Sequence, residues 1–158
     1  MRIIVFADTH GSTRAVREVF KRNEDASVFI FLGDGENDLS RMRKAYPEKT
    51  ILSVAGNCDY SSQSPEAAVY TAEDTKIFFT HGHNWGVKYS VDRLFYKAKE
   101  IDASIALFAH THKRFYEYSD DVHILNPGSA AFPRDGKPPC FAFIDITPKG
   151  IMCAHADL

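Results

Sequence analysis

The sequence is poor in the residues and patterns that mark several protein classes. It holds only three cysteines among 158 residues, Cys58, Cys140 and Cys153, an odd number at wide spacing. They form neither a disulfide framework nor a CxxC zinc motif, so a reducing compartment is expected, and we predict a cytoplasmic protein. No apolar run approaches the roughly 20 residues of a membrane span, and no signal peptide is recognised, so no membrane association is expected.

Neither sign of charge dominates the chain. Nineteen Lys and Arg residues face 21 Asp and Glu residues, for a formal net charge of −2. Without a basic stripe, strong nucleic-acid binding is not expected. The chain also lacks the GxSxG turn of serine hydrolases, the GxxxxGK[ST] phosphate loop and the HExxH zinc helix, which argues against those enzyme classes.

The length and apolar content of the chain fit one compact domain. Hydrophobic residues make up 44% and charged residues 25%, which is ordinary for a globular protein. A chain of 158 residues can bury a sizeable core without help from disulfides or metals. Since no linker, repeat or low-complexity segment divides it, we predict a single domain over residues 1–158.

The first two thirds of the chain alternate strand-like and helix-like segments. The expected strands are the apolar runs Arg2–Ala7, Ser27–Leu32, Thr50–Ala55, Lys76–Thr80 and Ser104–Ala109. Apolar residues spaced i, i+3, i+4 predict helices after Ser12 or Thr13, between Leu39 and Pro47, and after Ser90.

The last third of the chain is richer in strands. The expected segments are Arg114–Tyr118, Val122–Leu125, Cys140–Ile146 and Ile151–Ala154, with turn signals between them. Alternating strands and helices followed by a β-rich tail predict an α/β layered sandwich. The continuous apolar runs indicate strands that are covered on both faces.

Each of the five expected strands in the first two thirds is followed by carboxylate, imidazole or amide groups. The motifs are Asp8-Thr9-His10, Gly33-Asp34-Gly35, Gly56-Asn57-Cys58-Asp59, His81-Gly82-His83 and His110-Thr111-His112. In open α/β sheets, ligands bind in the crevice at the carboxyl ends of the strands. We therefore expect these side chains to face one crevice.

The donor atoms in these motifs indicate a metal site. A mixture of oxygen and nitrogen donors suits Mn²⁺, Fe, Co, Ni²⁺ or Zn²⁺ better than Ca²⁺. Asp8 and His10 are two residues apart, as are His110 and His112, so each pair can serve one metal or two neighbouring metals. Each motif alone has an ordinary interpretation as a turn or a surface histidine. Their joint placement after five strands favours metal binding.

Taken in order, the five motifs resemble the calcineurin-like metallophosphoesterase superfamily. The Gly56-Asn57-Cys58-Asp59 form, the short length and the segment Asn126-Pro127-Gly128-Ser129 followed by Arg134 are similar to its small bacterial and archaeal phosphodiesterases. The resemblance extends from the first strand to about Ile146. It implies a four-layer αββα sandwich, in which two sheets pack between helices.

The resemblance also implies a binuclear metal centre. It would hold two divalent ions per chain, with Mn²⁺ favoured and Ni²⁺, Fe, Zn²⁺ or Mg²⁺ as alternatives. The residues that match the ligands of the first ion are Asp8, His10, Asp34 and His112. Those that match the ligands of the second ion, with Asp34 as the bridge, are Asp34, Asn57, His81 and His110.

The activity implied is hydrolysis of a small phosphodiester, in which two metals activate water for in-line attack on phosphorus. Four residues are assigned to the catalytic machinery: Asp34, Asn57, Asp59 and His83. Asp34 would bridge the metals, and the amide of Asn57 would also donate to phosphate. His83 is either a donor that faces the substrate or an exposed loop histidine.

Two positions depart from the family pattern. Ala109 stands where Gly usually precedes His-Thr-His, and we expect it to be tolerated unless the backbone there needs positive φ. Cys58 stands where many relatives carry a His thought to protonate the leaving group, oriented by the residue that matches Asp59. We interpret Cys58 first as a small buried residue and second as a titrating acid. Slow hydrolysis of monoesters is expected in the first case.

Other interpretations stay open. A catalytically silent scaffold or binding subunit of the same fold would have lost metal ligands, and here every ligand position is filled. A nucleotide phosphatase or nuclease is a further alternative, although the chain has no residues for a capping domain. Arg134 would contact phosphate or form a surface salt bridge. A homo-oligomer could form through residues 115–118 or through the loop 60–65.

Overall fold

The apolar runs of the sequence form the strands of two five-stranded sheets. In the computed structural model, which describes residues 1–158, the first sheet has the strand order β10-β9-β1-β2-β3 and the second β4-β5-β6-β8-β7. The strands of the first sheet are β1 (Arg2–Phe6), β2 (Val28–Phe31), β3 (Thr50–Ser53), β9 (Cys140–Thr147) and β10 (Gly150–Asp157). Those of the second are β4 (Ala67–Ala72), β5 (Thr75–Thr80), β6 (Ile105–Leu107), β7 (Arg114–Ser119) and β8 (Val122–Pro127).

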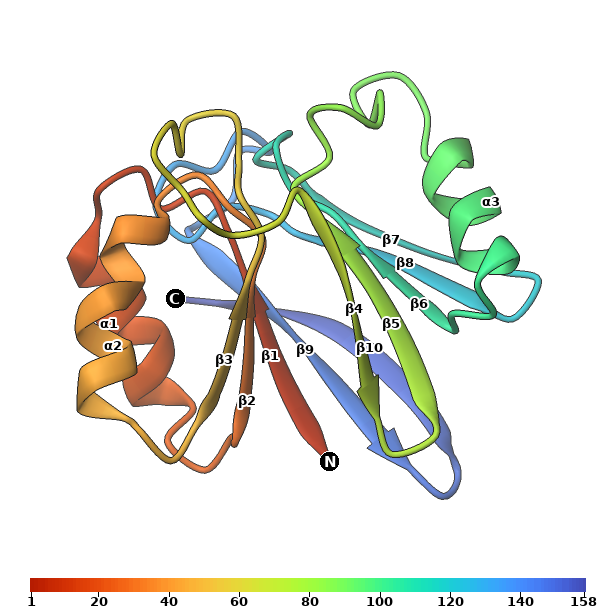
Figure 1. Ribbon diagram of the computed structural model, residues 1–158, viewed down its shortest axis with the longest axis horizontal. Helices are drawn as coiled ribbons and strands as arrows, with labels where there is room; N and C mark the ends of the chain where they lie inside the picture. Colours follow the sequence, from red (N-terminus) through yellow and green to blue (C-terminus); the bar gives the residue numbers. More distant parts are fainter.

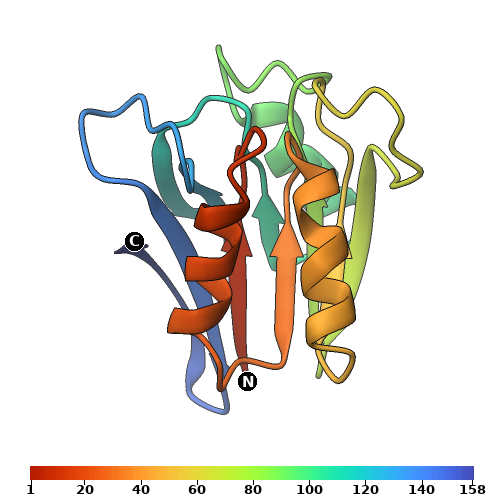
Figure 2. The ribbon, with the colours of Figure 1, turned by 90° about the vertical axis from the view of Figure 1, so that its left-hand side faces the viewer.

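Helices cover the outer face of each sheet. The helix α1 (Thr13–Arg22), the short 3-10 turn η1 (Glu36–Leu39) and α2 (Ser40–Ala45) lie against the first sheet, and α3 (Asp92–Glu100) lies against the second (Figure 1, Figure 2). The two sheets face each other between these helices. The order helix, sheet, sheet, helix confirms the predicted four-layer sandwich.

The strand β1 shows why its apolar run is continuous rather than alternating. Ile3 and Val5 point into the core between the two sheets, whereas Ile4 and Phe6 pack against α1. All four side chains are fully buried. A strand with covers on both faces needs apolar residues at every position, as the sequence indicated. On the helix side, the ring of Phe20 stacks on Phe29 with centroids 4.1 Å apart.

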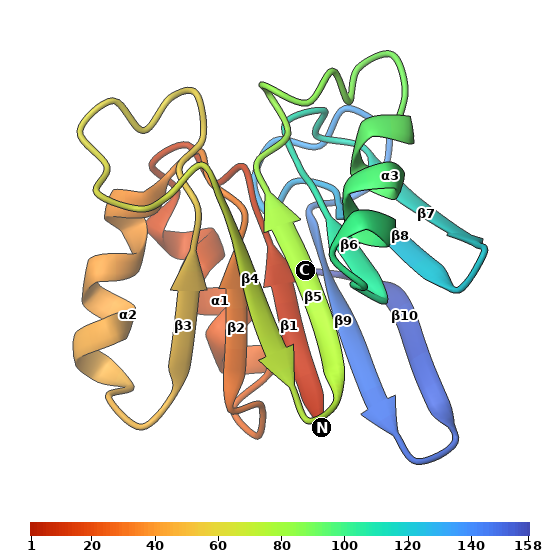
Figure 3. The ribbon, with the colours of Figure 1, turned by 45° about the vertical axis from the view of Figure 1, so that its right-hand side comes forward.

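Parallel pairing brings the ends of the motif-bearing strands to one edge of the molecule. β1, β2 and β3 pair in parallel in the first sheet, and β5, β6 and β8 do so in the second. Figure 3 shows that β1, β3 and β5 point toward the same end, where the longer loops gather. The loops that follow these strands therefore meet above the sheets.

All nine expected strands and the three expected helical regions are present, and one strand was not expected. β4 (Ala67–Ala72) is the edge strand of its sheet, and only Ala72 among its residues is buried, while Val69 is exposed. The hydroxyl of Ser12 accepts from the N–H of Ala15 and caps α1 as predicted. None of the helices is both long and apolar enough to cross a bilayer.

Candidate metal centre

The donor residues share an unusual backbone conformation. Positive φ occurs at the donors Asp8, His10, Asp34, His110 and His112. The other non-glycine residues with positive φ, at 73, 102, 120 and 121, are Asp or Glu residues outside this site. Only a few per cent of non-glycine residues adopt this region, Asp and His more readily than most. Such a concentration at one edge of the sheets indicates that the loops are shaped for function.

Three donors form a first group around Asp8. The Nε2 atoms of His10 and His112 lie 3.1 Å apart, and that of His112 lies 3.7 Å from an oxygen of Asp8. Both oxygens of the fully buried Asp8 carboxylate lack a hydrogen-bond partner. Burial and the nearby charge of Asp34 raise the pKa of Asp8 well above its usual range. A buried carboxylate without partners is costly, and a cation would stabilise it.

A second group surrounds His81. Its Nε2 lies 3.5 Å from an oxygen of Asp34 and 3.2 Å from Oδ1 of Asn57. The ring centroid of His110 lies 5.1 Å from that of His81. Burial, together with the neighbouring His81, lowers the pKa of His110 to about 4, and burial also lowers the pKa of His81. Both imidazoles are therefore neutral near pH 7, which is the form that binds metals.

Carbonyl groups fix the orientation of two of these rings. Nδ1 of His81 donates to the carbonyl of Leu32, and Nδ1 of His112 donates to that of Phe132, each at 2.7 Å. A proton on Nδ1 leaves a lone pair on Nε2, which points toward the carboxylates. This arrangement is typical of metal-ligating histidines.

Asp34 lies between the two groups. One of its oxygens is 3.8 Å from Nε2 of His10 and 3.5 Å from Nε2 of His81. The other accepts from the backbone N–H of Cys58 at 2.8 Å. The structure thus brings together all seven residues that the sequence proposed as ligands, and their oxygen and nitrogen donors fit divalent transition metals.

Asp59 ties the loops of the second and third strands together. Its two carboxylate oxygens accept from the backbone N–H groups of Asp34, Gly35, Glu36 and Gly56 at 2.7–3.0 Å. Burial alone would raise the pKa of Asp59, but these four donors hold it below its usual value. The position of Asp34 therefore depends on Asp59, and Asp59 makes no hydrogen bond to the thiol of Cys58.

His83 lies beside the second group and is half-buried. Its ring centroid is 5.4 Å from that of His81 and 6.3 Å from that of His110. Its Nδ1 is buried and has no hydrogen-bond partner. The ring is near enough to face a substrate, and its catalytic role stays a prediction.

The two departures from the family pattern have different outcomes. Ala109 is buried with an ordinary negative φ, and its N–H donates to the carbonyl of His81, so the added methyl group is accommodated as expected. The interpretation of Cys58 as a small buried residue is wrong, because its side chain is exposed at the rim of the site. Its backbone N–H donates to Asp34, and its sulfur lies within 4.8 Å of donor atoms of His10 and Asp34.

Several residues that position the donors were not assigned a role from the sequence. The carboxylate of Asp38 accepts from the hydroxyl of Thr9 and the N–H of Gly11, which shapes the loop that carries His10. The hydroxyl of Ser129 donates to the carbonyl of Asp8 at 2.8 Å, and the amide of Asn126 donates to the carbonyl of Ala109. Asn126 and Ser129 belong to a motif that the resemblance did include; no pattern marked Asp38.

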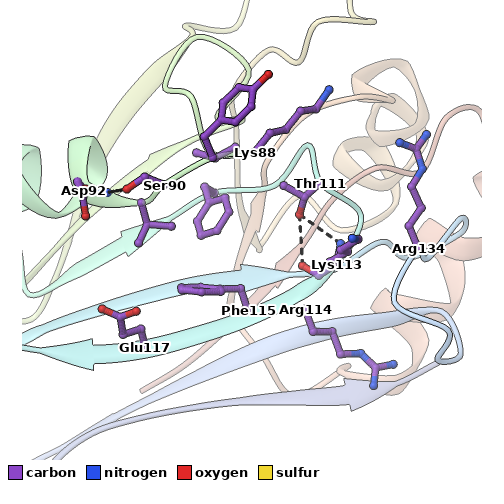
Figure 4. Close-up of a pocket in the computed structure, with 13 residues that line it drawn as sticks. Lys88, Ser90, Asp92, Thr111, Lys113, Arg114, Phe115, Glu117 and Arg134 are labelled. Carbon is purple, nitrogen blue, oxygen red and sulfur yellow. Dashed lines mark hydrogen bonds between the residues drawn. The ribbon is translucent and has the colours of Figure 1, made fainter.

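Two cationic side chains border the donors. A cavity of about 200 Å³ is lined by His10, Asp34, Asn57, Cys58, Lys88, His110, His112 and Arg134. Lys88 and Arg134 are exposed, come from different loops and form no ion pair within the chain, so the surface salt bridge considered for Arg134 is absent (Figure 4). Their positive charge beside the donor cluster favours an anionic ligand.

Comparisons with known proteins agree with this geometry. The profile of the calcineurin-like phosphoesterase superfamily domain matches residues 1–149. A phosphodiesterase of Methanocaldococcus jannaschii is 36% identical over 144 residues, which cover 81% of this chain and 83% of the relative. The crystal structure of a predicted phosphoesterase of Streptococcus pneumoniae superposes with a TM-score of 0.80 at 28% identity, over 98% of this chain and 97% of the other.

The fold is also shared with proteins of a different kind. A Vps29 structure from Entamoeba histolytica, described as complexed with Zn²⁺, matches with a TM-score of 0.75 at 21% identity, over 99% of each chain. At this identity the likeness concerns the fold alone.

Proposed function

The chain belongs to the calcineurin-like phosphoesterase superfamily, and on that premise we propose that it is a metal-dependent phosphodiesterase for a small phosphodiester. One observation carries the proposal. The two buried oxygens of Asp8 have no partner in the protein, and neutral histidines surround them and Asp34 with their lone pairs turned inward. Such a cluster is costly in isolation and is stabilised by cations.

Two divalent ions fit the donor groups described above. Asp8, His10 and His112 would hold one, Asn57, His81 and His110 would hold the other, and Asp34 would contribute to both. When bound, such ions lower the pKa of water so that it can attack phosphorus in line with the leaving group. Mn²⁺ is our first choice for both positions, because oxygen donors contribute alongside imidazoles.

The chain itself orients the substrate. Lys88 and Arg134 attract the phosphoryl oxygens to the mouth of the cavity. The exposed side chain of Asn57 places an amide group at the same mouth, where its N–H can donate to phosphate. Asp59 and the carbonyls of Leu32 and Phe132 keep the donor loops fixed, so little reorganisation accompanies the reaction.

A preference for substrates with good leaving groups follows from Cys58. Partial desolvation and the Asp34 carboxylate raise the pKa of the Cys58 thiol above its usual value, which makes it a weak acid near neutral pH. Without an imidazole at this position, leaving groups that need a proton depart slowly. The choice of a diester over a monoester is supported by the 36% identical archaeal relative, which is called a phosphodiesterase.

The test compares bis-p-nitrophenyl phosphate with p-nitrophenyl phosphate. The protein is stripped of metal, then supplied with Mn²⁺, Ni²⁺, Zn²⁺ or Mg²⁺ in turn, with Asp34→Asn as the control. We expect turnover of the diester that depends on added metal, exceeds turnover of the monoester and is lost in Asp34→Asn. Turnover that is insensitive to metal removal, or equal in the variant, would contradict the proposal.

The likeness to Vps29 makes a non-catalytic scaffold the second candidate. Metal binding alone does not separate the two, since a Vps29 structure is itself described with Zn²⁺. Hydrolysis does separate them. Stoichiometric metal binding without turnover of any phosphoester would favour the scaffold.

A further inference from the structure

A second, larger cavity adjoins the donor cluster. Its volume is about 750 Å³, and Lys88 and Arg134 line both this cavity and the smaller one that holds the donors. Its walls come from the loop before α3 on one side and from β7 on the other (Figure 4). A phosphate held by Lys88 and Arg134 would therefore touch both spaces at once.

The floor of this cavity is apolar and aromatic. The rings of Phe108 and Phe115 lie 5.7 Å apart at 59°, and Val87 and Val91 flank them. Phe108 and Val87 are buried, whereas Phe115 and Val91 are half-exposed and face the cavity. Tyr89, which also lines the cavity, is 95% exposed, so its ring is free to stack on a ligand.

Polar groups without partners lie farther from the cationic border. Asp92 and Glu117 line the cavity from opposite walls, and neither carboxylate forms a hydrogen bond or ion pair within the chain (Figure 4). The hydroxyl of Ser90 accepts from the N–H of Asp92. Carboxylates in this position accept hydrogen bonds from ligand hydroxyl or amino groups.

We infer that this cavity is the subsite for one ester group of the phosphodiester, and that the group carries a flat ring and hydrogen-bond donors, as a nucleoside does. This inference rests on the proposed function. The cationic border fits the phosphate, the aromatic floor fits the ring, and the free carboxylates fit the donors. The volume lies within the usual range of small-molecule sites, and a methyl ester would leave it almost empty.

The experiment uses three diesters that release the same p-nitrophenolate. They are the methyl, phenyl and thymidine 5′ esters of p-nitrophenyl phosphate, assayed with metal-loaded wild type. Stacking of a ring on aromatic side chains predicts a kcat/KM about 10-fold higher for the phenyl and thymidine esters than for the methyl ester, mainly through KM.

Two substitutions of Phe115 and two controls test the assignment. Phe115→Ala, and Phe115→Leu in case the first fails to fold, should remove the advantage of the two aromatic esters and leave the methyl ester unchanged. Tyr116→Ala is the matched control: Tyr116 is the next residue of β7 and bonds His123 rather than lining the cavity, so this variant should keep the preference. Glu117→Ala should weaken only the thymidine ester.

Equal kcat/KM for all three esters in wild type would overturn the inference, as would a loss in the Phe115 variants that is the same for all three. If wild type hydrolyses none of them with any metal, the proposed function fails, and the subsite is then judged by calorimetry. Thymidine 5′-monophosphate binding more tightly than methyl phosphate, with the difference lost in Phe115→Ala, supports the subsite. Equal binding of the two overturns it.

Discussion

The two sheets contribute different chemistry to one site. Loops of the first sheet supply three oxygen donors, Asp8, Asp34 and Asn57, together with His10. The donors that follow strands of the second sheet are all imidazoles: His81, His110 and His112. The first sheet thus provides the negative charge and the second provides neutral nitrogen. Neither set alone suits a transition metal as well as both, so the site forms only where the sheets pack.

The two sheets also hold their donors by different means. In the first sheet, backbone N–H groups donate to carboxylates, as at Asp59 and Asp38. In the second, ring N–H groups donate to backbone carbonyls, and one of these bonds, from His81 to Leu32, joins the second sheet to the first. In both sheets these bonds join segments 20 or more residues apart in sequence, so both sets of donors depend on the folded chain.

The largest effect is expected from Asp34→Asn, because Asp34 lies between the two donor groups, around Asp8 and around His81. The change keeps the shape of the side chain and removes its charge, so activity should fall below detection and the metal content per chain should drop. Metal analysis after dialysis, beside an assay of bis-p-nitrophenyl phosphate, measures both. Wild-type metal content in the variant would show that the two donor groups do not share Asp34.

Asp59→Ala should destabilise the loops that carry Asp34 and Asn57 without removing a proposed metal ligand. Four backbone N–H groups lose their acceptor, and since Asp59 is only half-buried, water would replace part of the loss. We expect unfolding free energy to fall by about 2–4 kcal/mol. Urea unfolding checks the value. Asp59→Asn, which keeps one oxygen, is the milder control, and an unchanged midpoint in both would contradict the role given to Asp59.

Asp8→Asn should have opposite effects on two properties: it should stabilise the metal-free protein and weaken metal binding. The raised pKa of Asp8 means that the folded state holds its proton more tightly than the unfolded state. The stability contributed by that proton is present in acid, below the unfolded pKa, and is lost as pH rises through the folded pKa. At pH 7 the variant should gain about 1–3 kcal/mol in EDTA. This gain in unfolding free energy should disappear at low pH. A variant that is less stable than wild type at pH 7 would contradict the destabilising role given to the Asp8 charge.

The smallest effect, a change in how stability depends on pH, is expected from replacing His110, one of the imidazoles of the second sheet. Its pKa of about 4 in the folded protein is below the value in the unfolded chain, so the unfolded state binds the proton first. The stability this contributes is present above about pH 6.5 and is lost as pH falls toward 4. His110→Ala should flatten this part of the stability profile of the metal-free protein, and an unchanged slope would contradict the lowered pKa of His110. Melting temperatures between pH 4 and 7 measure the slope.

Much of this arrangement is encoded locally and could be predicted. Apolar runs such as Arg2–Phe6 specify strands covered on both faces, and the motif after each run specifies the donors. β4 was missed because Ala occupies three of its six positions, so it lacks the run of large apolar residues that marks a strand such as β1. The hydrogen bonds that Asp38 accepts join residues 27 or more positions apart. Lys88 reaches the rim of the donor cavity only because two separate loops meet there. Such contacts leave no periodic signal in the sequence.

The exposure of Cys58 shows the same limit at a single residue. Its thiol was expected inside because cysteines are usually buried. The position of the residue at the rim is set instead by its own N–H, which donates to Asp34, a residue 24 positions earlier. A backbone hydrogen bond thus overrides the tendency of the side chain.

The left-handed backbone at the donors also restricts how the chain can evolve. At Asp8 and Asp34, Asn tolerates the same backbone angles, whereas branched or bulky side chains do not. Exchange of Asp for Asn requires a single nucleotide change in the codon, removes a charge and leaves the loop in place. A descendant can therefore lose the negative charge of the donor cluster without losing its architecture, and the surface so preserved is available for recruitment as a partner-binding face.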